Sequence, residues 1–95
     1  MSNLHQLMSD REPAIGECLA IVRPGDEILL VGDGVRALVD DIGKLAGVTG
    51  QLTALAADAR DHGVELRASE LEIRLVEDDV WVEKVTLHEQ VLSWL

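Results

Sequence analysis

Aromatic side chains are almost absent from this chain of 95 residues, which has two tryptophans, Trp81 and Trp94, and neither phenylalanine nor tyrosine. Hydrophobic residues still make up 47% of the sequence, so the core must be built from Leu, Val, Ile and Ala. A chain of this length cannot bury two separate cores, which predicts one domain over residues 1–95. We expect modest stability, which assembly with other subunits would raise.

Cysteine is also scarce, because Cys18 is the only one and the chain therefore cannot form an internal disulfide. The three histidines, His5, His62 and His88, are scattered along the sequence. One thiol and three scattered imidazoles do not give the ligand spacing that zinc sites use. The sequence thus predicts neither a metal ion nor another cofactor.

Basic residues are few: 8 Lys and Arg stand against 18 Asp and Glu, giving a formal charge of −10 with no basic cluster. Phosphate contacts need cationic side chains, so direct nucleic-acid binding is disfavoured and a basic protein surface is a better partner. The longest apolar run is far shorter than the ~20 residues of a bilayer-spanning helix. Residues 1–5 also lack the features of a secretory signal. We therefore expect a cytoplasmic protein with no membrane partner.

The most informative segment that is present joins Glu27–Val31 to the turn Gly32–Gly34. Four consecutive apolar residues predict a strand covered on both faces, and the glycines permit a sharp turn into a helix, with Asp33 as the expected cap. Gly32 to Ala37 also fits a dinucleotide-binding fingerprint. We reject that reading, because a carboxylate inside the loop would repel a pyrophosphate and the chain leaves little room for a nucleotide.

The remaining pattern alternates strands with helices, which predicts an α/β protein with a mostly parallel sheet. Ser9 to Glu12 reads as a capping box that starts a helix. Arg23 to Asp26 fits a type II turn, and Gly47 and Gly63 are expected to end helices. The expected strands are 4–8, 27–31, 51–55 and 91–95, and the expected helices are 12–22, 35–47 and 56–62.

Residues 64–88 carry a weaker signal. Leu71, Ile73 and Leu75 alternate as in a strand. Residues 80–88 are rich in β-branched side chains and suit a hairpin, yet Asp78 or Asp79 could equally cap a helix there. From the residues alone, helix and strand both remain open for this stretch.

Several short segments, in order and with matching spacing, resemble the TusB/DsrH-like subunits of bacterial sulfur-relay complexes over nearly the whole chain. The shared order, spacing and total length carry the resemblance, because each segment alone is a common dipeptide or turn. The segments are Leu4-His5, Pro24-Gly25-Asp26, Leu29-Leu30, Asp33-Gly34-Val35, Ala54-Leu55 with Asp58 and Gly63, Val85 to His88, and Ser93-Trp94. Thr53, Trp81 and Arg36 depart from the family pattern and put details of packing and partner contacts in doubt.

The resemblance implies a DsrE/F/H-like fold: three layers around a mostly parallel sheet of about five strands, with a helix over residues 80–88. It also implies an accessory subunit of a persulfide-transfer complex, not a stand-alone enzyme, with DsrE/TusD-like and DsrF/TusC-like subunits as partners. Such complexes serve tRNA wobble-uridine 2-thiolation or dissimilatory sulfur oxidation. The alternative is a homo-oligomeric interaction module without sulfur chemistry.

Cys18 is the candidate site residue, because only a thiol could carry sulfur as a persulfide. Its place in an apolar helical stripe beside Glu17 favours a buried, unactivated cysteine. The family resemblance instead favours a functional cysteine, since members from sulfur oxidisers carry a cysteine at this place. Cys18 is therefore a candidate transient acceptor, while the principal sulfur-carrying thiol is expected on the DsrE/TusD-type partner.

The histidines and the chain end have plainer interpretations. His62 is expected at a helix end, where a cation is favourable. His5 and His88 would approach each other only if the first and last strands pair, and packing is the simpler role for both. Trp94 and Leu95 are expected to be buried, either at an interface or in the core of this chain.

Overall fold

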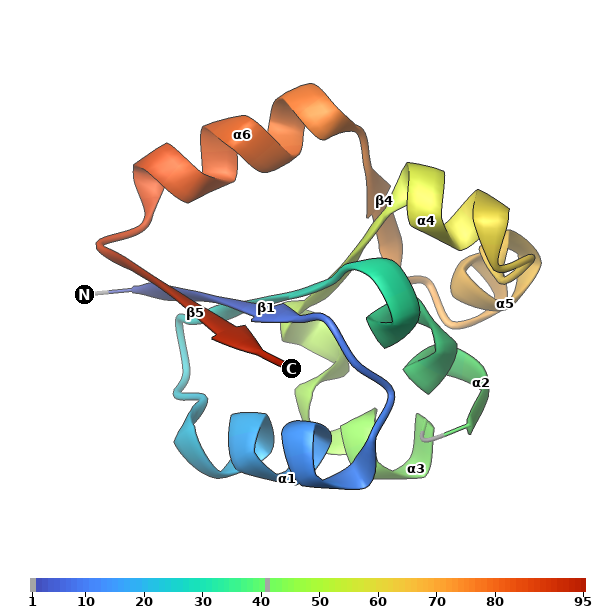
Figure 1. The fold of residues 1–95 in the computed structure, drawn as a ribbon, viewed down its shortest axis with the longest axis horizontal. Helices are drawn as coiled ribbons and strands as arrows, with labels where there is room; N and C mark the ends of the chain where they lie inside the picture. Colours follow the sequence, from blue (N-terminus) through green and yellow to red (C-terminus); the bar gives the residue numbers. More distant parts are fainter. Residues whose placement is uncertain (1, 41) are drawn as a thin grey trace.

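The computed structural model describes residues 2–40 and 42–95 and contains a five-stranded sheet (Figure 1). The strand order is β4-β3-β2-β1-β5, and all four pairings are parallel. The α/β fold class with a mostly parallel sheet is thus confirmed. The strands are β1 (Asn3–Leu7), β2 (Glu27–Leu30), β3 (Leu52–Leu55), β4 (Arg74–Val76) and β5 (Gln90–Trp94).

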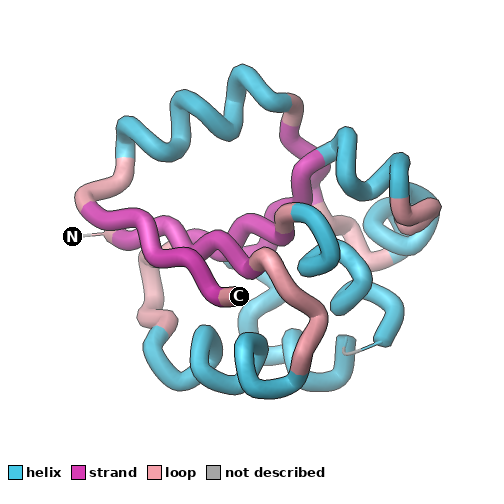
Figure 2. The backbone as a smooth tube through the Cα atoms, viewed as in Figure 1, coloured by secondary structure: helices cyan, strands magenta, loops and turns pink. Residues whose placement is uncertain are grey.

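Helices lie on both sides of the sheet, so the expected three layers are present (Figure 2). Side chains from five helices join the larger core on one face, and α6 lies over the other face. The α-helices are α1 (Glu12–Ile21), α2 (Ala37–Asp40), α3 (Ile42–Leu45), α4 (Ala56–Asp61), α5 (Glu65–Glu70) and α6 (Asp78–Leu87). Two 3₁₀ segments, η1 (Gly32–Arg36) and η2 (Ala46–Gln51), complete the set.

The core is aliphatic, as the shortage of aromatic residues requires. Ile15, Ile28, Leu30 and Leu38 are fully buried in the larger cluster between the sheet and the first five helices. The smaller cluster, on the α6 side, has five buried members. Those five are Leu4, Leu29, Val31, Leu55 and Val76. The two faces of the sheet are therefore buried to very different extents.

The prediction of one continuous helix over residues 35–47 is wrong. The segment is divided into η1, α2, α3 and η2, and Asp41 lies outside the described residues. Val35, Leu38 and Leu45 of its apolar face are nonetheless fully buried, so packing, not helix propensity, fixes their positions. Gly47 lies within η2 and does not adopt the expected left-handed conformation.

Two expected caps are also wrong. The residue before α1 is Arg11, whose side chain caps nothing, and the Ser9 hydroxyl instead accepts a hydrogen bond from the Arg11 amide at 3.0 Å. Asp33 does not cap the segment after β2. The Gly32 amide donates to the carboxylate of Asp58 in α4 at 2.6 Å, so a neighbouring βα unit supplies the acceptor.

The turns with glycine behave as expected. Gly25 has φ +94°, and the Asp26 amide donates to the Arg23 carbonyl at 3.0 Å, which closes the turn before β2. Gly63 has φ +68° directly after His62, the C-cap residue of α4, and ends that helix. Gly34 is required for a different reason: a Cβ there would collide with the Leu7 carbonyl group at the end of β1.

The weak region contains a helix that the pattern did not indicate, α5, followed by β4 where a strand was expected. Residues 78–87 form α6, so helix is correct and the hairpin is wrong. Neither Asp78 nor Asp79 caps it. Glu77 precedes the helix without a side-chain cap, and the two aspartates lie in the first turn, where the helix dipole favours negative charge.

Candidate functional site

The only thiol lies inside the molecule. Cys18 is on the buried side of α1 and is 1% exposed, within the larger core cluster. Burial raises the pKa of the Cys18 thiol to about 11, because a low-dielectric surrounding disfavours the thiolate. In this conformation the group is a neutral apolar side chain at neutral pH. Its role as a sulfur acceptor stays a prediction.

A second group of polar residues ties the two ends of the chain to the sheet, and we call it the His5 clasp. The His5 ring is fully buried, and its Nε2 lies 3.0 Å from the Asp26 carboxylate. The Trp94 indole donates to His5 Nδ1 at 3.1 Å, and the two rings are stacked. Because indole N–H is only a donor, these bonds assign the neutral tautomer with the proton on Nε2.

Asp26 is the anchor of the clasp. Burial alone would raise the pKa of its carboxyl group, but hydrogen bonds from the His5 side chain and from the amides of Asn3 and Arg23 outweigh it and lower the pKa to about 2. The residue is therefore an acceptor-only carboxylate at neutral pH. Every bond named here joins β1 or the turn after α1 to the residue that precedes β2.

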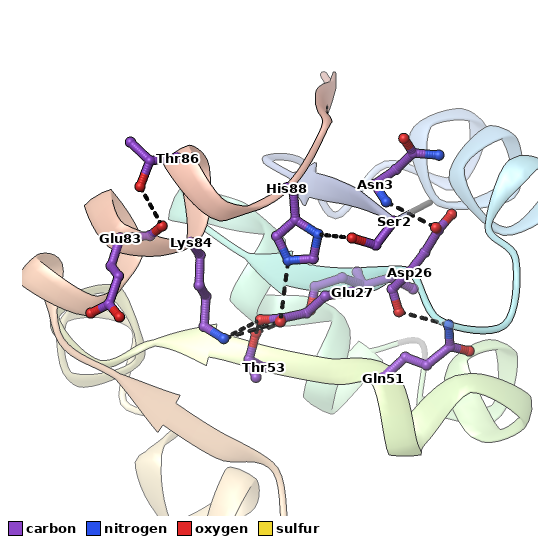
Figure 3. A network of polar contacts seen from close by, with 11 residues as sticks. Ser2, Asn3, Asp26, Glu27, Gln51, Thr53, Glu83, Lys84, Thr86 and His88 are labelled. Carbon is purple, nitrogen blue, oxygen red and sulfur yellow. Dashed lines mark hydrogen bonds and ion pairs between the residues drawn. The ribbon is translucent and has the colours of Figure 1, made fainter.

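A third group surrounds Glu27 at the start of β2 and holds the C-terminal end of α6 (Figure 3). Lys84 Nζ lies 2.8 Å and 3.0 Å from the two carboxylate oxygens. The Thr53 hydroxyl donates to the same carboxylate at 3.1 Å, and His88 Nε2 lies 3.7 Å away. Glu27 is thus shared by a cation, a hydroxyl and an imidazole, and we call this group the Glu27 network.

The Glu27 network forms part of the wall of a polar cleft of about 590 Å³. Glu72, Arg74 and Gln51 also line the cleft, and the Gln51 amide donates to the Arg23 and Asp26 carbonyls in the turn before β2. Ligands of open parallel sheets usually bind beyond the carboxyl ends of the strands, but this cleft is at the opposite, amino ends. Cys18 does not line it, so thiol and cleft are separate features.

Ser2, His88 and Glu27 place a hydroxyl, an imidazole and a carboxylate in a row, and Ser2 Oγ lies 3.1 Å from His88 Nδ1. This order of groups resembles that of a nucleophile, a base and an orienting acid. The resemblance fails at the acid, because Lys84 already neutralises Glu27 and a 3.7 Å separation from His88 is too long for a hydrogen bond. We assign these residues to holding α6.

The structure separates the three histidines. The strand that carries His5, β1, pairs with β5, the strand that follows His88. The His5 ring nevertheless bonds Asp26, whereas the His88 ring bonds Ser2. His62 follows α4 directly, as expected for a helix end, and its Nε2 lies 3.5 Å from Asp33.

The last two residues of the chain, Trp94 and Leu95, differ in burial. Trp94 is partly buried: it packs against the larger core of this chain and bonds His5, in line with the expectation of packing within this chain. Leu95 is 79% exposed.

Sequence reasoning missed the roles of Asp26 and Glu27, which it treated as a turn residue and a strand start. The spacing of Lys84 and His88, four residues apart on one helical face, was the available signal for the Glu27 network.

The described residues show neither a metal-binding cluster nor a membrane-spanning helix. In residues 2–40 and 42–95, no three His, Cys, Asp or Glu side chains come together in a way that could hold a metal ion. No helix in this part of the chain has both the length and the apolar character needed to cross a bilayer.

Comparison with known proteins shows a similar fold and the family of the chain. The fold is similar to a solved structure of a conserved protein of unknown function from Bacteroides thetaiotaomicron, with a TM-score of 0.67 at 16% identity over 96% of this chain and 93% of that chain. At that identity the likeness concerns the fold alone. A search of curated proteins found no significant match. The family model described as DsrH like protein matches residues 8–91. The chain therefore belongs to the DsrH-like family, which supports a role in a sulfur-relay complex.

Proposed function

We propose that this protein is an accessory subunit of a cytoplasmic persulfide-transfer complex, where it docks against homologous DsrE/TusD-like and DsrF/TusC-like subunits. The observation that carries the proposal is the family match over residues 8–91. The three-layer fold is consistent with it. In this role the protein shapes the complex around a partner's persulfide and is not itself a stand-alone enzyme.

Burial of Cys18 supports a docking role ahead of a carrier role. As a carrier, the Cys18 thiolate would attack the terminal sulfur of a partner's cysteine persulfide. A new S–S bond forms on Cys18, the old S–S bond breaks, and the partner's thiolate leaves with the electron pair. The step needs Cys18 exposed and deprotonated, whereas the thiol is buried and has a raised pKa. Transfer to Cys18 would therefore require a conformational change on assembly.

The complex would serve either tRNA wobble-uridine 2-thiolation or dissimilatory sulfur oxidation. A formal charge of −10 fits a subunit that hands sulfur to a downstream enzyme and does not itself bind RNA. The presence of Cys18 favours the sulfur-oxidation branch, because the resemblance associates a helix-one cysteine with that branch.

The test is co-expression of the chain with DsrE-type and DsrF-type subunits from the same genome, followed by size-exclusion chromatography. We expect a stable complex that contains all three chains. Elution of this chain as a homo-oligomer that ignores both partners would overturn the proposal in favour of a self-associating module.

Mass spectrometry of the complex after loading with a persulfide donor separates docking from carrying. We expect a partner cysteine to gain the mass of about one sulfur atom, as in a persulfide, and Cys18 to gain none. A Cys18→Ala variant should still assemble and still support loading of the partner. Added sulfur on Cys18 would instead establish the acceptor role.

A further inference from the structure

Helix α6 is attached to the molecule by polar contacts and by the partly buried Val80 and Trp81, and none of its residues is fully buried. The Trp81 indole donates to the Gln6 side chain at 2.7 Å, Lys84 pairs with Glu27, and His88 contacts Ser2. These residues occupy the side of the helix that faces the sheet. Val82, Val85 and Leu87 of the same helix are exposed.

Next to these contacts α6 carries an apolar surface, which we call the α6 strip and define as Trp81, Val82, Val85 and Thr86. Trp81 takes part in both, because it is partly buried against the smaller core cluster and also lines this surface. Val82 is 64% exposed and Val85 is 39% exposed. The four residues line a shallow pocket of about 280 Å³. Trp81 and Val85, like Val82 and Thr86, are four residues apart and form two adjacent ridges with a groove between them.

Acidic side chains surround the α6 strip. Asp78 and Asp79 lie in the first turn of α6, Glu83 lies beside Val82, and Glu89 follows the helix. Among the described residues, no ion pair involves any of these four carboxylates. Two nearby cations are already used, because Arg60 pairs with Glu77 and Lys84 pairs with Glu27. The strip is therefore apolar at its centre and negative at its rim.

We propose that the α6 strip docks a protein partner whose contact surface has apolar side chains at its centre and Lys or Arg at its rim. The proposal rests on the proposed function and specifies the surface that meets the partner. A second copy of this chain is the wrong occupant. A two-fold contact would set the acidic rim of one copy against that of the other, and like charges at an interface are unfavourable.

The α6 strip borders the open edge of the sheet. The Gln6 side chain that accepts the Trp81 bond also donates to Ser93 of β5 at 3.1 Å. β5 is an edge strand, and its Val91 is 37% exposed. A partner that covers the strip and this edge would shield backbone groups that an isolated edge strand leaves open to unwanted pairing.

The experiment measures the affinity of purified chain variants for the purified complex of the DsrE-type and DsrF-type subunits, by titration calorimetry at two salt concentrations. The test variant carries Val82→Asp and Val85→Asp. The matched control carries Leu66→Asp on α5, where Leu66 is 74% exposed. Both variants should keep the wild-type melting temperature, because the substituted side chains lie at the surface.

We expect the test variant to bind at least about tenfold more weakly and the control to bind like wild type. Reversing the charge of the rim with Asp79→Lys and Glu83→Lys should also weaken binding and reduce the dependence of the affinity on salt. Wild-type affinity in the Val82/Val85 variant would overturn this inference and leave the proposed function intact. Failure of the wild type to bind the complex would overturn both.

Sedimentation of the chain alone tests the other occupant. We expect wild type and the Val82/Val85 variant to sediment as the same species. A wild-type dimer that the two aspartates dissociate would show that a second copy covers the strip, and that outcome would overturn the assignment of a basic partner.

Discussion

Glu72 holds the backbone in the left-handed region, with φ +59°, directly after the C-cap residue of α5. The Glu72 amide donates to the Ser69 carbonyl and the Ile73 amide to the Ala68 carbonyl, which is the hydrogen-bond pattern of a helix end that usually has glycine. A side chain at this φ carries a steric cost that glycine does not.

We expect Glu72→Gly to stabilise the protein by about 0.5–1 kcal/mol, because glycine removes that cost. The measurement is urea unfolding followed by circular dichroism. Glu70→Gly, at the last residue of α5, is the matched control and should destabilise, because glycine has a lower helix propensity than glutamate. Loss of stability in both variants would contradict the interpretation of the Glu72 backbone.

Cys18 allows a direct test of burial, since it is the only thiol. With its pKa raised to about 11 and its side chain in the core, we expect very slow reaction with a thiol reagent at pH 7. Reaction should become fast in urea, where the ordinary thiol pKa returns. Rapid modification of the folded chain would show that α1 opens readily and would favour the acceptor role.

Asp26 links stability to acidic pH. Its pKa is about 2 in the folded protein against an ordinary value of 3.8, so the unfolded chain takes up the proton first as the pH falls. The stability that Asp26 contributes is therefore present above pH 4 and is lost between about pH 4 and pH 2. Asp26→Asn should reduce stability at neutral pH and make stability depend less steeply on pH between pH 4 and pH 2.

The matched control for Asp26 is the exposed Asp40. Asp40→Asn should leave the slope of stability against pH unchanged between pH 4 and pH 2, as measured by urea titrations at several pH values. Equal slopes for Asp26→Asn and wild type would mean that the His5 clasp does not depend on a charged carboxylate.

At the scale of elements, α6 differs from the other long helix, α1. α1 buries Ala14, Ile15 and Cys18, whereas α6 buries no residue. The Glu27 network therefore carries much of its attachment. Lys84 and Glu27 are 17% and 21% exposed, so the pair is largely desolvated and its loss should cost more than the loss of a surface pair.

We expect Glu27→Gln to destabilise the protein by about 1–3 kcal/mol and to speed amide hydrogen exchange in the last turns of α6. Glu77→Gln removes the exposed pair with Arg60 and is the control, expected to cost at most about 0.5–1 kcal/mol. Unchanged exchange in α6 after Glu27→Gln would show that apolar contacts of Val80 and Trp81 hold the helix instead.

The sequence predicted β2 and α1 well, because a run of buried aliphatic residues and a helical apolar stripe are signals of local period. It could not predict the breaks between Gly32 and Gln51, since the burial of Leu38 and Leu45 depends on tertiary packing and not on a continuous helix. The Glu27 network was equally out of reach. It joins residues of β2, β3 and α6 that are distant in the sequence, and only the sheet order brings them together.

At the scale of the whole molecule, the charge of −10 dominates. Of the 18 acidic residues, Asp78, Asp79, Glu83 and Glu89 have no cationic partner among the described ion pairs. Self-repulsion of this kind opposes the compact state and is screened by salt.

We therefore expect the melting temperature to rise between low salt and about 0.5 M NaCl, where the Debye length falls to a few ångströms. Calorimetry should show one cooperative transition, as expected for a single domain over residues 1–95. Sodium sulfate at matched ionic strength distinguishes screening from a general salting-out effect. A melting temperature that falls with NaCl would contradict the argument from self-repulsion.

The pairing of β1 with β5 joins the two ends of the chain, from Asn3 beside Gln90 to Leu7 beside Trp94. Such a pairing closes nearly the longest loop that the chain can form, and loops of that length form late and slowly during folding. We therefore expect β5 to be the last strand to join the sheet. Until it does, the nascent chain exposes the edge of β1, so the time spent in this state sets the window in which a chaperone or a partner subunit could intervene.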